Sequence, residues 1–172
     1  FPTRRSSDLR SPSGVRPGAA RRIRLGHGLC LSKALSMFAL NAPIKARLQS
    51  LPALAGWTVR TSTELVDRAT LPAVDVRVPG GGVAGARSGA VMVQPGWSLV
   101  LAVRRSATAA DELEAAFAAV IEALHGWAPG QHAGRGWEPL QLAAVADAVF
   151  AEDGLAGVEL TFSTQALYRG QE

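Results

Sequence analysis

The alternation of apolar and polar side chains predicts its clearest helix in the second half of the chain. From Ala109 to His125 the apolar residues recur at three- and four-residue spacing, at Leu113, Phe117, Val120, Ile121 and Leu124. Three acidic residues lie in the first turns, where they complement the helix dipole, and Gly126 is a natural stop. The pattern therefore predicts one long amphipathic helix with a solvated acidic face.

Two strand patterns precede this helix. Residues 74–78 alternate between apolar and polar side chains, and residues 90–104 form a long strand region in which Pro95-Gly96 predicts a bend or a sheet edge. Between the two lies a glycine-rich segment, Pro79 to Gly85, that predicts a flexible hairpin loop.

Residues 41–68 predict shorter elements. Ala42–Leu51 reads as a helix with Asn41 as its N-cap, and Pro52 ends it. Residues 57–60 predict a short strand. Residues 61–64, Thr-Ser-Thr-Glu, then match a capping box that opens a short helix through residue 68.

After the long helix, a loop containing Trp127, Pro129 and Trp137 leads to residues 140–150, and an alternating strand starts at residue 158 and runs toward Tyr168. The order is α-β-α-β-β-α-β-β. Hairpins outnumber crossovers, so we expect an α+β fold, with a mixed or mainly antiparallel β-sheet packed against two or three helices.

The first nine residues, Phe-Pro-Thr-Arg-Arg-Ser-Ser-Asp-Leu, resemble a translated sequencing adapter. Residues 1–36 hold eight of the 18 basic residues but one of the 14 acidic ones, so the net charge of +4 becomes −3 for residues 37–172. We expect residues 1–36 to be an artefactual or disordered basic extension, with targeting as the alternative, and one domain to start at Met37. The high pI of the whole sequence then comes from residues 1–36, so it does not indicate that residues 37–172 bind DNA.

Catalytic signals are weak in residues 37–172. The only cysteine, Cys30, precedes them, and no serine lies in a Gly-x-Ser-x-Gly elbow. The glycine-rich segment lacks the Lys-Ser/Thr ending of a phosphate-binding loop. His125 and His132, with Glu138, are the candidates for a metal site, although a helix-terminal and a solvent-exposed histidine explain them more simply. We expect no enzyme, no cofactor and no membrane span.

A family resemblance covers essentially all of residues 37–172. It rests on Met37-Phe38, Ala46-Arg47-Leu48, Leu51-Pro52, residues 97–105, Gly126-Trp127-Ala128-Pro129, Glu138-Pro139-Leu140 and the strand of residues 158–164 after an acidic-glycine turn. These segments resemble phage tail terminator proteins.

The resemblance implies a virion structural protein, assembled in the bacterial host cytoplasm. Such a protein forms a ring, typically a hexamer, on the head-proximal end of the tail tube, where it ends tube polymerisation and supports head-tail joining. The implied partners are other copies of the chain, the tail tube protein and head-neck connector proteins, while DNA passes through without specific binding. The alternatives are another head-tail connector or tail-completion protein, or a small metal- or ligand-binding enzyme.

Six residues are candidates for contacts with a neighbouring subunit or the tube. They lie in or next to the predicted glycine-rich loop or at the end of the long predicted strand: Gly80, Gly81, Gly82, Arg87, Arg104 and Arg105. Arg104 and Arg105 follow one another on an alternating strand, so we expect them to face opposite ways. Trp127 and Pro129 are expected to pack the loop onto the sheet.

Overall fold

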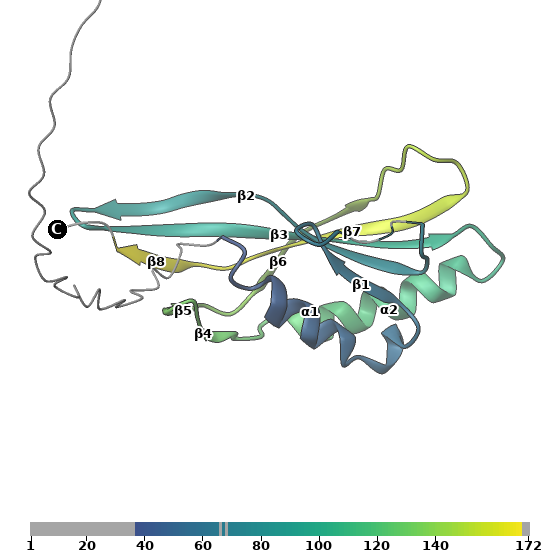
Figure 1. Ribbon diagram of the computed structural model, residues 1–172, viewed down its shortest axis with the longest axis horizontal. Helices are drawn as coiled ribbons and strands as arrows, with labels where there is room; N and C mark the ends of the chain where they lie inside the picture. The colour runs from purple at the N-terminus through teal and green to yellow at the C-terminus, as the bar shows by residue number, and fades with distance from the viewer. Residues whose placement is uncertain (1–36, 66, 68, 170–172) are drawn as a thin grey trace, which may run out of the picture. The chain divides into compact units, whose positions relative to one another are not determined.

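Eight strands and two α-helices make up the part of the chain that the computed structural model describes, residues 37–172 without 66, 68 and 170–172. The predicted basic extension, residues 1–36 with Cys30, lies outside the described residues. The elements follow one another as α1 (Asn41–Gln49), the 3-10 helix η1 (Pro52–Leu54), β1 (Thr58–Thr61), β2 (Ala73–Arg87), β3 (Ala90–Arg104), α2 (Ala109–Leu124), β4 (Gly130–His132), β5 (Arg135–Trp137), β6 (Gln141–Asp147), β7 (Leu155–Ser163) and β8 (Ala166–Arg169) (Figure 1).

The central strand of the sheet is β3, and its two ends have different partners. On one side it pairs antiparallel with β2 along nearly its whole length. On the other side, residues 96–104 pair with β7, while residues 90–93 pair with β8. β6 extends the sheet beyond β7, the β4–β5 hairpin extends it beyond β8, and β1 adds to β2 in parallel. The sheet therefore forks at β3 into a β7–β6 branch and a β8–β5–β4 branch.

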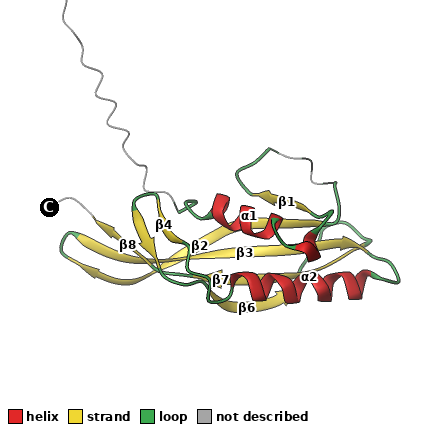
Figure 2. Cartoon of the chain, turned by 90° about the horizontal axis from the view of Figure 1, so that it is seen from below, coloured by secondary structure: helices red, strands yellow, loops and turns green. Residues whose placement is uncertain are grey.

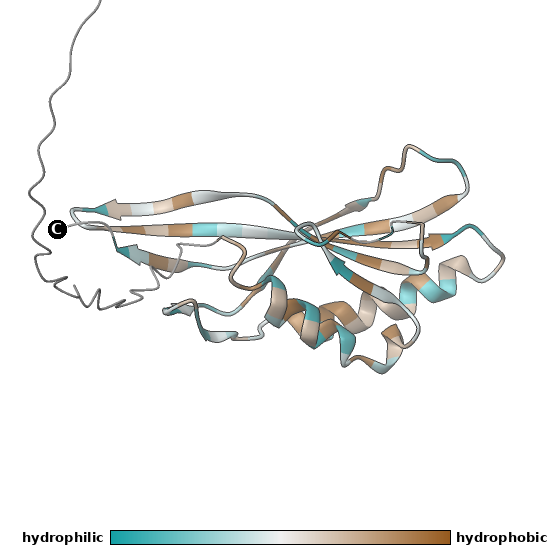
Figure 3. Cartoon of the chain, in the orientation of Figure 1, coloured by the Kyte–Doolittle hydropathy of each residue, from teal (hydrophilic) through white to brown (hydrophobic). Residues whose placement is uncertain are grey.

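Both helices cover the same face of the sheet (Figure 2). Apolar residues recur along both helices and the strands behind them (Figure 3). Each large side chain buried there stabilises the fold by about 1.5–3 kcal/mol relative to exposure. The largest fully buried side chains are Leu40, Ile44, Leu48, Val74, Val76, Trp97, Leu99, Leu101, Leu124, Leu140, Leu160 and Phe162. Neither helix of the described part has the length and apolar content that a membrane span requires.

Trp97 connects α1 to the sheet. Its ring is fully buried and meets the ring of Trp137 edge-on, with centroids 5.8 Å apart. Its indole Nε1 donates a hydrogen bond of 3.0 Å to Oδ1 of Asn41, because a buried indole N–H requires an acceptor. The predicted N-cap role of Asn41 is therefore wrong: α1 starts at Asn41 itself, and its N-cap, Leu40, makes no side-chain cap bond.

Two predicted elements are confirmed. The helix predicted from residue 109 to residue 125 is α2, which ends one residue earlier, and Gly126 follows with a positive φ of 75°. The long strand predicted over residues 90–104 is β3, with the same bounds. Both segments are long and strongly patterned, so local sequence and tertiary packing favour the same structure.

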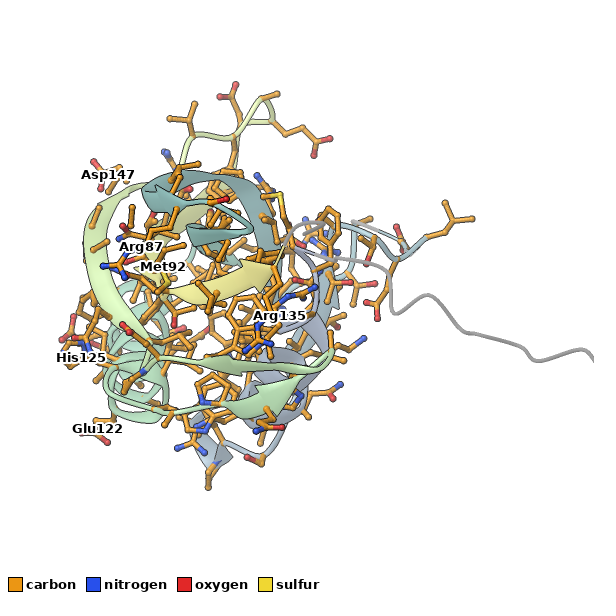
Figure 4. The ribbon with its side chains drawn as sticks, turned by 90° about the vertical axis from the view of Figure 1, so that its left-hand side faces the viewer. Arg87, Met92, Glu122, His125, Arg135 and Asp147 are labelled. Carbon is orange, nitrogen blue, oxygen red and sulfur yellow. The ribbon has the colours of Figure 1, made fainter. Side chains whose placement is uncertain are left out.

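The predicted fold class, an α+β fold with the sheet packed against two or three helices in the order α-β-α-β-β-α-β-β, is wrong. The described chain is mainly β-sheet, and this sheet curls into a half-barrel (Figure 4). Part of the predicted loop of residues 127–137 forms the β4–β5 hairpin instead. Ala133 and Gly134 at its turn have positive φ values of 52° and 75°, as a tight two-residue hairpin requires. The last predicted strand is divided into β7 and β8.

The helix predicted to start at the capping box also does not form. Half of the box is present, since the Thr61 N–H donates to Oε2 of Glu64 over 3.0 Å. However, Thr61 is the last residue of β1 and pairs with Val76 of β2, which keeps its backbone extended. The Glu64 carboxylate meanwhile accepts hydrogen bonds of 2.7 and 2.9 Å from Lys45 of α1, so tertiary contacts override the local signal.

The predicted flexible loop at Pro79 to Gly85 is instead part of β2. Gly80, Gly81 and Gly82 lie opposite Gly96, Pro95 and Gln94 of β3, with register shifts on either side. A Cβ on Gly81 would lie 2.9 Å from the Cα of Pro95, so only glycine allows this close approach. Strand pairing satisfies the backbone groups that a loop would leave to water, and the turn falls at residues 88–89.

Candidate interaction surfaces

The distal part of the β2–β3 hairpin extends past both helices and forms, with β8, what we call the arm, residues 79–96 and 166–169 (Figure 1). β8 supports the hairpin through residues 90–93 of β3, and Trp137 of β5 pairs with Ala166 at its base. Because Trp137 and Ala166 are both buried, the base of the arm is held by the core. The arm is thus a supported projection rather than a free loop.

One face of the arm holds an apolar pocket of about 550 Å³. Arg87 and Met92 lie next to each other on this side, whereas Arg135 lies away from them (Figure 4). Leu167 of β8 also lines the pocket and is 44% exposed. The charged residues of the arm are Arg87 and Arg169, and its described residues include no carboxylate. The pocket therefore suits an apolar group that is accompanied by negative charge.

The structure separates the six residues that the sequence predicts for an interface. Gly80, Gly81 and Gly82 lie in the arm, and Arg87 ends β2 beside the first residue of β3. Arg104 ends β3 at the opposite extreme, with Arg105 just beyond it. Arg87 lies beside Ala90, and the fourteen steps along β3 from Ala90 to Arg104 span about 45 Å. One chain therefore cannot bring Arg87 and Arg104 into one site.

Arg105 makes hydrogen bonds within the chain. Its backbone N–H donates to the carbonyl of Gly154 over 2.8 Å, and its Nε donates to the carbonyl of Leu155 over 2.9 Å. Arg104 pairs with Leu155 in the β3–β7 ladder and is exposed. The two arginines thus lie at the base of the loop that joins β6 to β7.

The loop of residues 148–154, which we call the β6–β7 loop, presents a nearly fully exposed apolar side chain. Val149 is 96% exposed, and the charged residues of the loop are Glu152 and Asp153. The next residue, Phe150, turns inward and packs against Gly157, where a Cβ would lie 2.8 Å from its ring. None of the residues of this loop was among those predicted from the sequence as contact residues. The apolar residues 148–151, followed at once by two carboxylates, were the available signal.

β6 is an edge strand with unusually apolar exposure. Its residues 143–147 are all exposed, and only β7 pairs with it among the described strands. Val145, 48% exposed, lines a groove of about 250 Å³ against Leu113 and Phe117 of α2. Because the strand is not protected by lysine or proline, its edge is open to contact with another chain.

On the face of the sheet that the helices do not cover, charged side chains pair with one another. Arg60, nearly buried, forms an ion pair with Asp75, and its Nη1 donates to the carbonyl of Asp67 over 2.8 Å. Arg77 donates to Asp75 from the solvent side over 3.2 Å. Ser98 likewise donates to Glu159 of β7. These partners compensate the desolvation of the buried charges and assign the cluster a structural role.

The Lys45–Glu64 pair connects α1 to the turn after β1. The Lys45 ammonium, together with the N–H of Thr61, holds the pKa of the Glu64 carboxyl below its ordinary value of 4.5. Both side chains are partly exposed, at 25% and 35%, so solvent screens the interaction. The pair therefore helps to position the turn and contributes little to stability.

The histidines proposed for a metal site make other contacts. Nδ1 of His125 accepts a hydrogen bond of 3.1 Å from the Leu142 N–H, and Nε2 of His132 lies 2.8 Å from the carbonyl of Pro129. Among the described residues, no three His, Cys, Asp or Glu side chains gather as a metal site would require. The predicted packing residue Trp127 lies half-buried under the guanidinium of Arg47, 4.9 Å from its ring centroid.

Comparison with solved structures identifies a related fold. The chain superposes on a chain from the virion of a native gene transfer agent particle with a TM-score of 0.56 and 17% sequence identity. The match covers 76% of this chain and 96% of the other. No protein-family model and no curated protein matches the sequence. The likeness is therefore one of fold.

Proposed function

We propose that this protein is a structural component of a phage-like virion, and that residues 37–172 form a homo-oligomeric ring at the head-proximal end of the tail tube. The observation that carries the proposal is the fold match, which takes in nearly all of a chain from a gene transfer agent virion. The sequence resemblance to phage tail terminators supports the finer role, in which the ring, a hexamer in that family, ends tube polymerisation and supports head-tail joining.

The surfaces of the chain suit such an assembly. A ring of identical subunits needs two different patches on each copy, one for each neighbour. The arm lies at one end of β3, and the β6–β7 loop lies at the other (Figure 1). In such a ring, the exposed Arg87 and Arg104 serve as contact residues, and the glycines at residues 80–82 let β2 lie close to β3 in the arm.

The experiment is deletion of the gene in a phage or prophage that encodes this chain, followed by electron microscopy of the particles. We expect separate heads and overlong tails, and complementation with the full chain restores normal virions. Unjoined tails of normal length would instead assign the protein to another head-tail connector. Unchanged, infectious virions would contradict any role in the virion.

A further inference from the structure

The arm and the β6–β7 loop, which lie at opposite ends of β3, carry complementary features. The arm offers an apolar pocket with positive charge beside it, from Arg87, and an exposed wall formed by Leu167. The β6–β7 loop offers the exposed Val149, with the carboxylates of Glu152 and Asp153 near it in sequence. The first is a pocket with a positive charge beside it, whereas the second is a projecting loop with negative charge (Figure 1).

These features have no partners within one chain. Among the described residues, Arg87, Glu152 and Asp153 form no ion pair. The pocket lies near the start of β3, and the loop lies near its end, about 45 Å away. A single exposed apolar side chain is ordinary on a protein surface, so it is the opposite charge and the matching shape of the two features that favour a contact between them. A contact between them therefore requires two copies.

We propose that the β6–β7 loop of one copy docks on the arm pocket of the next copy. Val149 enters the pocket between Met92 and Leu167, and Arg87 pairs with the carboxylates of Glu152 and Asp153. The inference rests on the proposed assembly of identical subunits and names the surfaces that join them. Because the two surfaces differ, the contact is heterologous and continues from copy to copy until a ring closes.

The geometry of the loop supports this docking. Phe150 is fixed against Gly157, and Arg105 holds both Gly154 and Leu155, so the loop is anchored at its base. Val149 points outward from this anchored frame. A pre-positioned apolar residue loses little conformational entropy on binding, which favours its use as an anchor. The pocket of about 550 Å³ has room for this side chain together with the loop alanines beside it.

The test uses the full chain and two single variants, Arg87→Glu in the arm and Val149→Glu in the loop. We expect each to weaken self-association by about 10- to 100-fold, measured by analytical ultracentrifugation. Leu65→Glu is the matched control, because Leu65 is also a fully exposed apolar loop residue and lies outside both surfaces. Circular dichroism checks that all variants remain folded.

Mixing the two variants gives the sharper result. Each retains one intact surface, so the proposal predicts a one-to-one heterodimer and no larger species. Combining Arg87→Glu with Glu152→Arg and Asp153→Arg in one chain should restore association. As a second measurement, Val149→Cys with Leu167→Cys, in a chain carrying Cys30→Ser, should oxidise to a ladder of covalent oligomers.

Oligomers that resist both single variants would overturn the inference and leave the proposed ring intact. Absence of both self-association and a disulfide ladder would also overturn it, since the contact joins free copies. Neither outcome depends on the deletion experiment, which tests the virion role separately.

Discussion

Replacing Gly157 by alanine tests the packing between β3, β7 and the β6–β7 loop. A Cβ at this position would lie 2.1 Å from the backbone carbonyl oxygen of Leu101 and 2.8 Å from the ring of Phe150. The ring can rotate away, but the carbonyl belongs to the central strand of the sheet. We therefore expect β7 to move away from β3 locally and Phe150 to leave its site.

The magnitude follows from the contacts that are lost. Two weakened backbone hydrogen bonds cost about 1 kcal/mol each, and displacement of the Phe150 ring costs about 1 kcal/mol more. Alanine restricts the unfolded chain and offsets about 0.5–1 kcal/mol of this loss. The expected net effect is a loss of about 2 kcal/mol in the free energy of unfolding, or about 4–8 °C in Tm.

Urea denaturation monitored by circular dichroism measures this loss. Gly82→Ala is the control, since a Cβ there would meet nothing within 4 Å, and it should leave stability within about 0.5 kcal/mol. Equal stability of Gly157→Ala and the wild-type chain would refute the packing argument.

Three further predictions concern single side chains. Asn41→Ala removes the acceptor of the buried Trp97 N–H and should cost about 1–3 kcal/mol of unfolding free energy in urea; stability equal to wild type would contradict the role of that hydrogen bond. The lowered pKa of Glu64 means that its ion pair stabilises the fold above the ordinary pKa of 4.5 and that this contribution is lost as the pH falls through the lowered pKa. Glu64→Gln should therefore reduce Tm slightly at pH 7 and leave it unchanged in strong acid, where an equal reduction would argue against the pair. The Arg135 guanidinium lies 4.1 Å from the ring centroid of Tyr168, and Arg135→Ala should cost about 0.5–1 kcal/mol, more than Arg135→Lys; the reverse order would exclude a specific stacking contribution.

The sequence predicts well the elements whose local pattern agrees with their packing. α2 and β3 are such elements, because a long periodic run leaves little choice of conformation. The segment after β1 shows the opposite case. Its capping box is real, but pairing of Thr61 in β1 and the Lys45–Glu64 contact lie outside any local window. Tertiary contacts therefore determine whether such a segment becomes a helix.

The glycine-rich part of β2 was unpredictable for a related reason. Three successive glycines favour a loop when considered alone, yet the ladder to β3 supplies partners for their backbone groups. The arm and its pocket follow from this extension and were therefore not visible from the sequence. Arg87 was identified as a candidate contact residue, whereas Val149 and Leu167, which complete the proposed contact, were not.

β3 is one uninterrupted strand of 15 residues that reaches from the arm to the base of the β6–β7 loop. In the proposed head-to-tail ring, β3 would span the distance between the two contact surfaces of each subunit. Inserting two residues would lengthen the strand by about 7 Å, whereas one residue would turn the row of Trp97, Leu99 and Leu101 away from the core. The distance between the two proposed contact surfaces could therefore change only in steps of two residues.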